Sequence, residues 1–207
     1  TIYSQYQLND NLSLKAILSA GKNNITTKRS VQVGVNESKI ATGKIDNMNY
    51  GAEIGGGYKV KITDGLMVTP SMGLRYNMYK DSKFKEKGVG VHNITTTSKT
   101  SSDLTGIFGT KIEYYHKLSN GAVIIPAINL GIEHKLSNNE SKVKAKLAWQ
   151  DNYFDADNNK KSPSTSYNIG TSVLAKHSNI ELEASYNLKL KKKYTGHQGS
   201  LKLRFLF

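Results

Sequence analysis

Charged residues in this chain keep to one parity within each stretch of alternating apolar and polar residues. Between Met48 and Val60 the even positions are apolar or glycine, and the odd positions are polar, charged or glycine. Residues 66–78 repeat the pattern. Because successive side chains of a β-strand point to opposite faces, each stretch predicts a strand with one apolar and one polar face.

The same pattern predicts nine strands along the chain, at residues 2–8, 12–21, 48–60, 66–78, 104–115, 122–135, 167–176, 180–190 and 194–207. The charged residues of the strand bodies share the polar parity: Lys15, Glu53, Lys59, Arg75, Lys111, Glu113, Glu133, Lys135, Lys176, Glu181, Glu183, Lys189, Lys202 and Arg204. A charge on a lipid-facing position near the bilayer midplane costs about 2–4 kcal/mol, which would enforce this segregation. A soluble β-sandwich also alternates, with its charges toward solvent, so parity alone leaves both architectures open.

Connector lengths separate the two architectures. Short connectors, at residues 9–11, 61–65, 119–121 and 177–179, alternate with long ones at residues 22–47, 81–103 and 136–166, and only a brief link around 191–193 departs from this order. Outer-membrane barrels have tight turns at one end and long polar loops at the other, whereas sandwiches mix their connections. The sequence therefore predicts an all-β, antiparallel, transmembrane outer-membrane β-barrel.

Composition excludes several other classes of protein. No run approaches the roughly 20 apolar residues that a membrane-spanning helix needs, and the absence of cysteine removes disulfides and thiolate metal sites. The net charge of +13 could indicate a nucleic-acid partner. Many of the lysines, however, lie in the polar segments between strands, and no nucleic-acid-binding motif surrounds them. We expect no nucleic-acid partner.

Catalytic signals are weak. The chain contains no GxSxG, HExxH or glycine-rich phosphate loop, and its five histidines lack metal-ligand spacing: His92, His116, His134, His177 and His197. Five polar residues could in principle converge at a barrel rim, namely Asp103, His134, Asp151, Asp155 and Asp157, but acidic residues are common in polar loops. We expect no enzymatic activity, no cofactor and no metal site.

Inward charges have a simpler explanation as pairs across a polar lumen. We expect the following to be pore-lining charges: Glu53, Arg75, Lys111, Glu113, Glu133, Lys202 and Arg204.

Residues 65–74 and 121–130 also resemble each other, with Pro70 and Pro126 at equivalent places. Because proline cannot donate to a strand ladder, each should lie at a bulge or near a strand end, just beyond a short turn.

The carboxyl terminus carries a second signal. Phe207 is the last residue, and apolar residues keep strict parity behind it at Phe205, Leu203 and Leu201, with Gly199 next. This resembles the terminal signal of outer-membrane proteins, in which the barrel-assembly machinery reads the final strand. The resemblance implies that these five residues act as a barrel-assembly signal.

Residues 193–205 and residues 68–76 resemble the translocator domains of autotransporters (type V secretion), especially those of surface antigens from intracellular bacteria. The resemblance implies a twelve-stranded barrel with a helix in its pore, and an N-terminal passenger carried to the cell surface. Nine strands are recognised here, with no helix and no passenger. We therefore expect residues 1–207 to be the C-terminal part of such a domain, without its upstream strands and passenger.

Two functions follow as alternatives. The first is an outer-membrane anchor and translocator whose partners are lipid and lipopolysaccharide, the barrel-assembly machinery and its own passenger. The second is a small adhesin barrel whose basic extracellular loops bind ligands, including those of a host-cell surface. Strand pairing distinguishes them. A translocator fragment should be an open sheet with a free edge at residues 2–8, whereas an eight-stranded barrel would pair residues 12–21 with residues 194–207.

Overall fold

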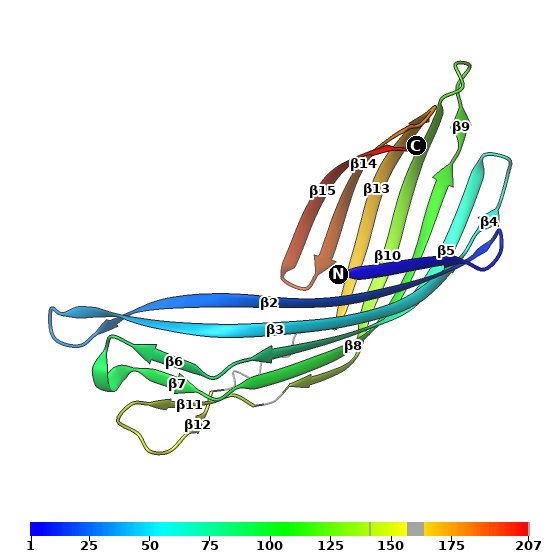
Figure 1. Ribbon diagram of the computed structural model, residues 1–207. Coiled ribbons are helices and arrows are strands. Elements are labelled where there is room, and N and C mark those ends of the chain that lie inside the picture. The colour runs from blue at the N-terminus through cyan, green and yellow to red at the C-terminus, as the bar shows by residue number, and fades with distance from the viewer. Residues whose placement is uncertain (141, 157–163, 207) are drawn as a thin grey trace.

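Nine long strands form the framework of the computed structural model, which describes residues 1–140, 142–156 and 164–206. In spatial order they are β1 (Ile2–Gln7), β2 (Leu12–Gln32), β3 (Ser38–Tyr58), β5 (Leu66–Asp81), β8 (Lys99–Tyr114), β10 (Val123–Glu140), β13 (Thr165–His177), β14 (Ile180–Lys191) and β15 (Tyr194–Phe205). All neighbouring pairs are antiparallel, and the sheet is strongly curved (Figure 1). The predicted all-β architecture and all nine predicted strands are confirmed.

The long connectors contain more regular structure than the sequence indicated. Residues 22–47 were expected to form a loop, but β2 and β3 continue through them as a paired hairpin from Lys22↔Met48 to Gln32↔Ser38. Four short strands from the other two connectors extend the sheet beside this hairpin: β6 (Phe84–Lys87), β7 (Ile94–Thr96), β11 (Lys144–Leu147) and β12 (Phe154–Asp155). The short helix η1 (Gly90–His92) lies between β6 and β7. Together they form a projecting sheet at the long-connector end of the molecule (Figure 1).

The two prolines interrupt the ladder at equivalent places. The pairing of β3 with β5 stops at Gly57↔Ser71 and resumes as β4 (Val60–Lys61) at Val60↔Val68, which leaves Pro70 in the gap. The pairing of β10 with β8 likewise stops at Ala127↔Glu113 and resumes as β9 (His116–Lys117), which leaves Pro126 in the gap. Each proline keeps a partner on its other side, because only one of its two neighbours needs the missing N–H.

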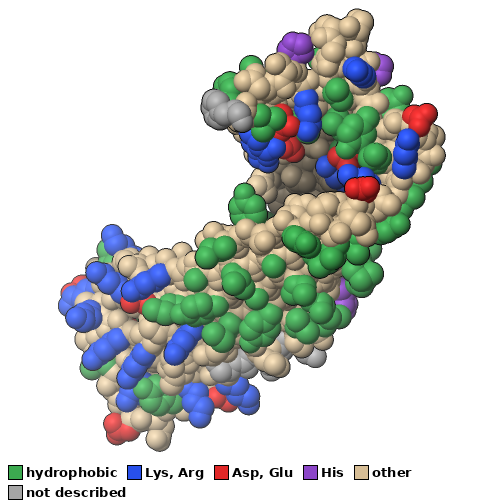
Figure 2. All heavy atoms as spheres, turned by 45° about the vertical axis from the view of Figure 1, so that its right-hand side comes forward, with side chains coloured by type: hydrophobic (Ala, Val, Ile, Leu, Met, Phe, Trp, Pro, Cys, Tyr) green, Lys and Arg blue, Asp and Glu red, His purple; other side chains and the backbone are tan. Residues whose placement is uncertain are grey.

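Burial is inverted relative to a soluble protein. Large apolar side chains such as Phe108 (57% exposed) and Met72 (66%) lie at the surface. The buried polar or charged residues are Glu53, Glu86, Asp103, Thr105, Ser166 and Glu181. We call the apolar side of the sheet the outer face and the polar side the inner face. Figure 2 shows apolar side chains over the outer face and charged ones within the hollow of the sheet. This distribution suits a sheet whose outer face contacts lipid.

Both edges of the sheet are open. Within the described residues β1 pairs only with β2, and β15 pairs only with β14. The predicted open sheet with a free first strand is confirmed, and the pairing of β2 with β15 that an eight-stranded barrel requires is not formed. No helix in the described part of the chain has the length and hydropathy to cross a membrane.

Candidate functional site

The candidate site is the inner face, and its centre is a pair of facing charges on neighbouring strands. Glu53 on β3 lies directly opposite Arg75 on β5 in the strand register. Arg75 Nε donates to Glu53 Oε2 at 2.6 Å, and Lys15 Nζ on β2 lies 2.7 Å from Glu53 Oε1. Glu53 is only 8% exposed. Both of its oxygens therefore have a cationic partner, as a buried carboxylate requires.

The same arginine connects this pair to the far side of the hollow. Arg75 Nη1 lies 3.3 Å from Glu133 Oε1 on β10, although β8 runs between β5 and β10. Glu133 Oε2 accepts hydrogen bonds from Lys189 Nζ at 2.6 Å and from Ser166 Oγ at 3.4 Å. One continuous chain of charges thus crosses the inner face from β2 to β14. Beside it lies a polar recess of about 240 Å³ that reaches from Arg75 and Asn77 to Lys189 and Lys191.

Further charges of the inner face form smaller groups. Asp103 accepts hydrogen bonds from Asn77 and Thr105, each at 3.2 Å, and Lys135 Nζ lies 3.8 Å from its other oxygen. Lys111 pairs with Glu113 at 2.6 Å. On the last strands the ion pairs are Lys176–Glu181, Arg204–Glu181 and Lys202–Glu183. The inner face is therefore charged but locally neutralised.

The seven predicted pore-lining residues have the same parity as this network and the same kind of environment. Glu53, Arg75 and Glu133 belong to the central chain of charges, and Lys111 and Glu113 pair with each other. Lys202 and Arg204 pair with carboxylates of β14. Lys15, Asp103, Glu181 and Lys189 belong to the same face but were left out of the predicted set. The parity of Lys15, Glu181 and Lys189 in the sequence was sufficient to predict that they lie on this face. Asp103 was instead assigned to the end of a loop.

The predicted barrel-assembly residues lie on the last strand of the open sheet. Leu201 (75% exposed), Leu203 (56%) and Phe205 (51%) project from the outer face of β15, and Gly199 shares their parity. Phe207 lies outside the described residues. These side chains are accessible because they point out of the outer face, and the backbone edge of β15 is also open, since no strand pairs with its other side within the part of the chain described.

Of the polar residues considered for catalysis, those that the structure describes lie on different elements and faces. Asp103 pairs with Lys135 on the inner face, whereas His134 has the opposite parity and bonds Thr165 Oγ1 at 2.8 Å. Asp155 lies on β12 in the projecting sheet, and Asp157 falls outside the described residues. In the described ranges no three His, Asp or Glu residues are grouped as metal ligands would be.

In the described part of the projecting sheet, the buried carboxylate of Glu86 pairs with the partly exposed Arg29. Arg29 on β2 donates to Glu86 on β6 through Nη2 at 2.7 Å and through Nε at 3.1 Å, and the Ile94 N–H donates to the same carboxylate at 2.9 Å. The hydrogen bonds from Arg29 hold the pKa of Glu86 below its usual range and raise the pKa of Arg29. Arg29 also donates to the His92 carbonyl at 3.1 Å. This pair ties the hairpin to β6 and to the loop before β7.

Comparisons with known proteins find similar sequences over most of this chain. A family model described as the autotransporter beta-domain matches residues 1–187. The putative surface cell antigen sca1 of Rickettsia conorii is 34% identical over 99% of this chain. Outer membrane protein A of R. conorii is 29% identical over the whole chain, and outer membrane protein B of Rickettsia typhi is 33% identical over 84% of it. The chain spans only 10–11% of the length of these relatives.

A solved structure has the same fold. The translocator domain of the autotransporter NalP from Neisseria meningitidis superimposes with a TM-score of 0.69 at 23% sequence identity. The match covers 98% of this chain and 63% of the NalP chain. Nearly all of this sheet therefore has a counterpart there, while part of the NalP structure has none here.

Proposed function

Because this chain belongs to the autotransporter beta-domain family, we propose that it anchors in the outer membrane and gives an N-terminal passenger a hydrophilic path to the cell surface. Its location is the bacterial outer membrane. The domain acts in anchoring and transport, and we assign it no catalytic step. The passenger is a proposal, since this chain covers only about a tenth of its relatives.

The single observation that carries the proposal is the division between the two faces of the sheet. The outer face is covered by exposed apolar side chains, among them Ile54, Leu74 and Phe108. The inner face carries the charge chain from Lys15 through Arg75 to Lys189. A polar wall enclosed by a lipid-facing surface is what a hydrophilic path through a bilayer needs.

We also propose that strands upstream of Thr1 close the barrel. Single-chain bacterial barrels close with an even number of strands, so nine long strands require an odd number more. Three would complete the twelve of the family, and they would cover the free edges of β1 and β15. Support comes from the 63% coverage of the NalP chain, which leaves room for additional elements.

The last strand is proposed as the signal read by the barrel-assembly machinery. Gly199, Leu201, Leu203, Phe205 and Phe207 would provide it, on a strand whose outer edge is unpaired within the described residues. An exposed strand edge with aligned apolar side chains is a ready partner for strand addition.

Translocation is tested with the full-length protein carrying an epitope in its passenger. Antibody binding to intact cells should report the epitope at the surface, and heat-modifiable migration should report the folded barrel. Deletion of Phe207 should abolish both signals. Folded barrel in the membrane with the epitope still hidden inside intact cells would contradict the proposal.

A further inference from the structure

Lysines on the projecting sheet occupy the face that continues the lipid-facing surface. Along β2 the outer-face positions run through Leu18 and Ala20 to Lys22 and Lys28, and along β3 they run from Tyr50 through Met48 to Lys44. Figure 2 shows the apolar band giving way to blue side chains toward the end of the projection. Since tyrosines of outer-membrane barrels mark the bilayer interface, the lysines lie beyond it on the long-connector side.

Strand register arranges these lysines in rows. One row runs Lys44↔Lys85↔Thr95↔Lys146 across β3, β6, β7 and β11. A parallel row runs Lys28↔Thr42↔Lys87. We name the five lysines of these two rows the lysine face: Lys28, Lys44, Lys85, Lys87 and Lys146. The opposite side of the same strands carries the buried residues Ala41, Glu86 and Ala145, so the lysine face is the solvent side of the projection.

The part of the protein that the structure describes does not neutralise the lysine face. Lys28, Lys44, Lys85 and Lys87 are exposed, and within the described part of the chain they form no ion pair. Lys146 lies over the Tyr153 ring at 5.1 Å. Carboxylates on this side are few: Asp46 lies 3.7 Å from Lys22, and Asp155 faces Lys144 across strands. Positive charge therefore accumulates at one level of the projection.

One contact on this face is unfavourable unless an anion is present. Lys44 and Lys85 lie directly opposite each other on neighbouring strands. Like charges in that position destabilise a sheet. A phosphate between the two ammonium groups would offset the repulsion and form charge-assisted hydrogen bonds with both.

We propose that the lysine face binds phosphate groups of lipopolysaccharide in the surrounding outer leaflet. The inference rests on the proposed function as an outer-membrane barrel, and it takes the long connectors to lie on the outer side of the membrane, as the long loops of such barrels do. Lys44 lies six residues beyond Tyr50, which is roughly 20 Å along the strand and about 14 Å above the interface at a 45° tilt. That height corresponds to the headgroup and inner saccharide region. Because the face continues the lipid-facing wall, the first anions it meets belong to neighbouring lipids, ahead of any host polyanion.

The binding is tested with the complete translocator domain, purified from the outer membrane into detergent and titrated with diphosphoryl lipid A. The double variant Lys44→Gln with Lys85→Gln should raise the dissociation constant for lipid A on the order of tenfold, since each lysine near an anionic lipid surface contributes to the binding free energy. Lys28→Gln with Lys87→Gln should have a similar but smaller effect. Lipid A without its phosphates should bind weakly to the wild type.

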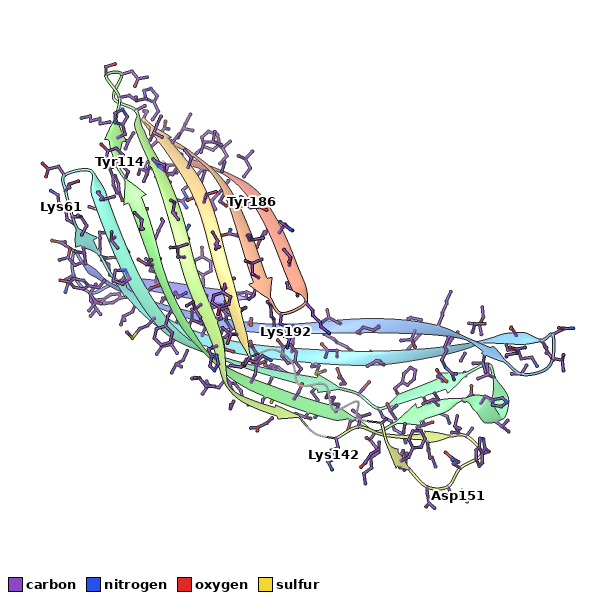
Figure 3. All side chains as sticks on the ribbon, turned by 180° about the vertical axis from the view of Figure 1, so that it is seen from behind. Lys61, Tyr114, Lys142, Asp151, Tyr186 and Lys192 are labelled. Carbon is purple, nitrogen blue, oxygen red and sulfur yellow. The ribbon has the colours of Figure 1, made fainter. Side chains whose placement is uncertain are left out.

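The matched control is Lys61→Gln with Lys117→Gln, which removes the same charge at the short-turn end, where Figure 3 shows Lys61. Its affinity should stay within about twofold of wild type. Unchanged affinity in both lysine-face variants, equal loss in the control, or tighter binding of heparin than of diphosphoryl lipid A would overturn the proposal. Passenger display should persist in the lysine-face variants, because their side chains lie outside the lumen. A lysine-face variant that binds lipid A as tightly as the control but no longer displays the passenger would instead count against the proposed translocator function.

Discussion

The inner face and the lysine face are both rich in cations, but the cations are mostly paired with carboxylates on the inner face and unpaired on the lysine face. On the inner face eight cations have a carboxylate within ion-pair distance: Lys15, Arg75, Lys111, Lys135, Lys176, Lys189, Lys202 and Arg204. Three lysines of the same parity near strand ends form no ion pair among the described residues: Lys59, Lys117 and Lys191. The five lysines of the lysine face have no such partner among the described residues, and four of them are exposed.

The difference follows from access to outside partners. Carboxylates such as Glu53 and Glu133 are partly or largely buried in the wall, so an unpaired charge there would carry a desolvation cost. Lysines of the projection reach water and the lipid headgroups, and their neutralisation can come from other molecules. Charge that is paired within the protein stabilises the wall, whereas charge left unpaired is available for binding.

The largest effect should come from placing a charged residue on the outer face instead of the inner face. Leu130→Arg places a charge on the lipid-facing side of β10, where it costs about 2–4 kcal/mol near the midplane and should block insertion. Asn129→Arg, one residue away, points to the inner face and should assemble. Heat-modifiable migration of membrane fractions measures both variants. Equal assembly of the two would show that the faces are wrongly assigned on β10.

A smaller effect is expected from breaking the central charge chain. Glu133→Gln removes one of the two carboxylates of Arg75 and the carboxylate partner of Lys189, and we expect a loss of about 1–3 kcal/mol because both cations are partly exposed. Lys44→Gln on the lysine face should change the free energy of unfolding by less than about 0.5 kcal/mol. Urea unfolding in detergent provides the measurement. A larger loss for Lys44→Gln than for Glu133→Gln would reverse the comparison.

Acid should loosen the projecting sheet through its own paired carboxylate. The pKa of Glu86 is lowered in the folded protein, so its contribution is fully present above the unfolded pKa of about 4.3 and is lost as pH falls through the folded value. We expect about 1 kcal/mol or less, given the partial exposure of Arg29. Hydrogen exchange of β6 and β7 in the wild type, corrected for the intrinsic exchange rate at each pH, should become faster as pH falls through the folded pKa of Glu86.

Two variants separate this effect from general acid sensitivity. Glu86→Gln should exchange faster at neutral pH and lose most of the pH dependence. Lys87→Gln, adjacent on β6 but on the opposite face, should keep the wild-type profile. A profile in Glu86→Gln identical to that of the wild type would remove Glu86 as the titrating group.

The smallest effect concerns the repulsion between Lys44 and Lys85. Lys85→Glu turns the facing pair into opposite charges, and it should stabilise the projecting sheet by about 0.2–1 kcal/mol in lipid-free detergent. The same substitution should weaken binding of diphosphoryl lipid A. Local hydrogen exchange and lipid titration, measured at low salt, report the two changes. If the substitution stabilised the sheet without weakening lipid binding, the Lys44–Lys85 pair would not be part of the lipid-binding site.

Sequence alone determined the nine strands, the two faces and the side on which each charged residue of those predicted strand bodies lies. A period of two is a local property, and lipid strictly excludes charge from one face, so the signal survives in every membrane-spanning stretch. The same logic placed Glu53, Arg75 and Glu133 on the polar side. It also anticipated the interruptions at Pro70 and Pro126, because a missing N–H acts wherever the strand lies.

Only the tertiary structure decided which residues meet. The contact of Arg75 with Glu133 across β8, and the facing of Lys44 and Lys85, depend on the register between strands, and a shift of one residue would remove both. The projecting sheet was missed for a related reason. Beyond the bilayer both faces of a strand can meet water or polar neighbours, so alternation fades from the sequence, and backbone pairing with adjacent strands determines the structure instead.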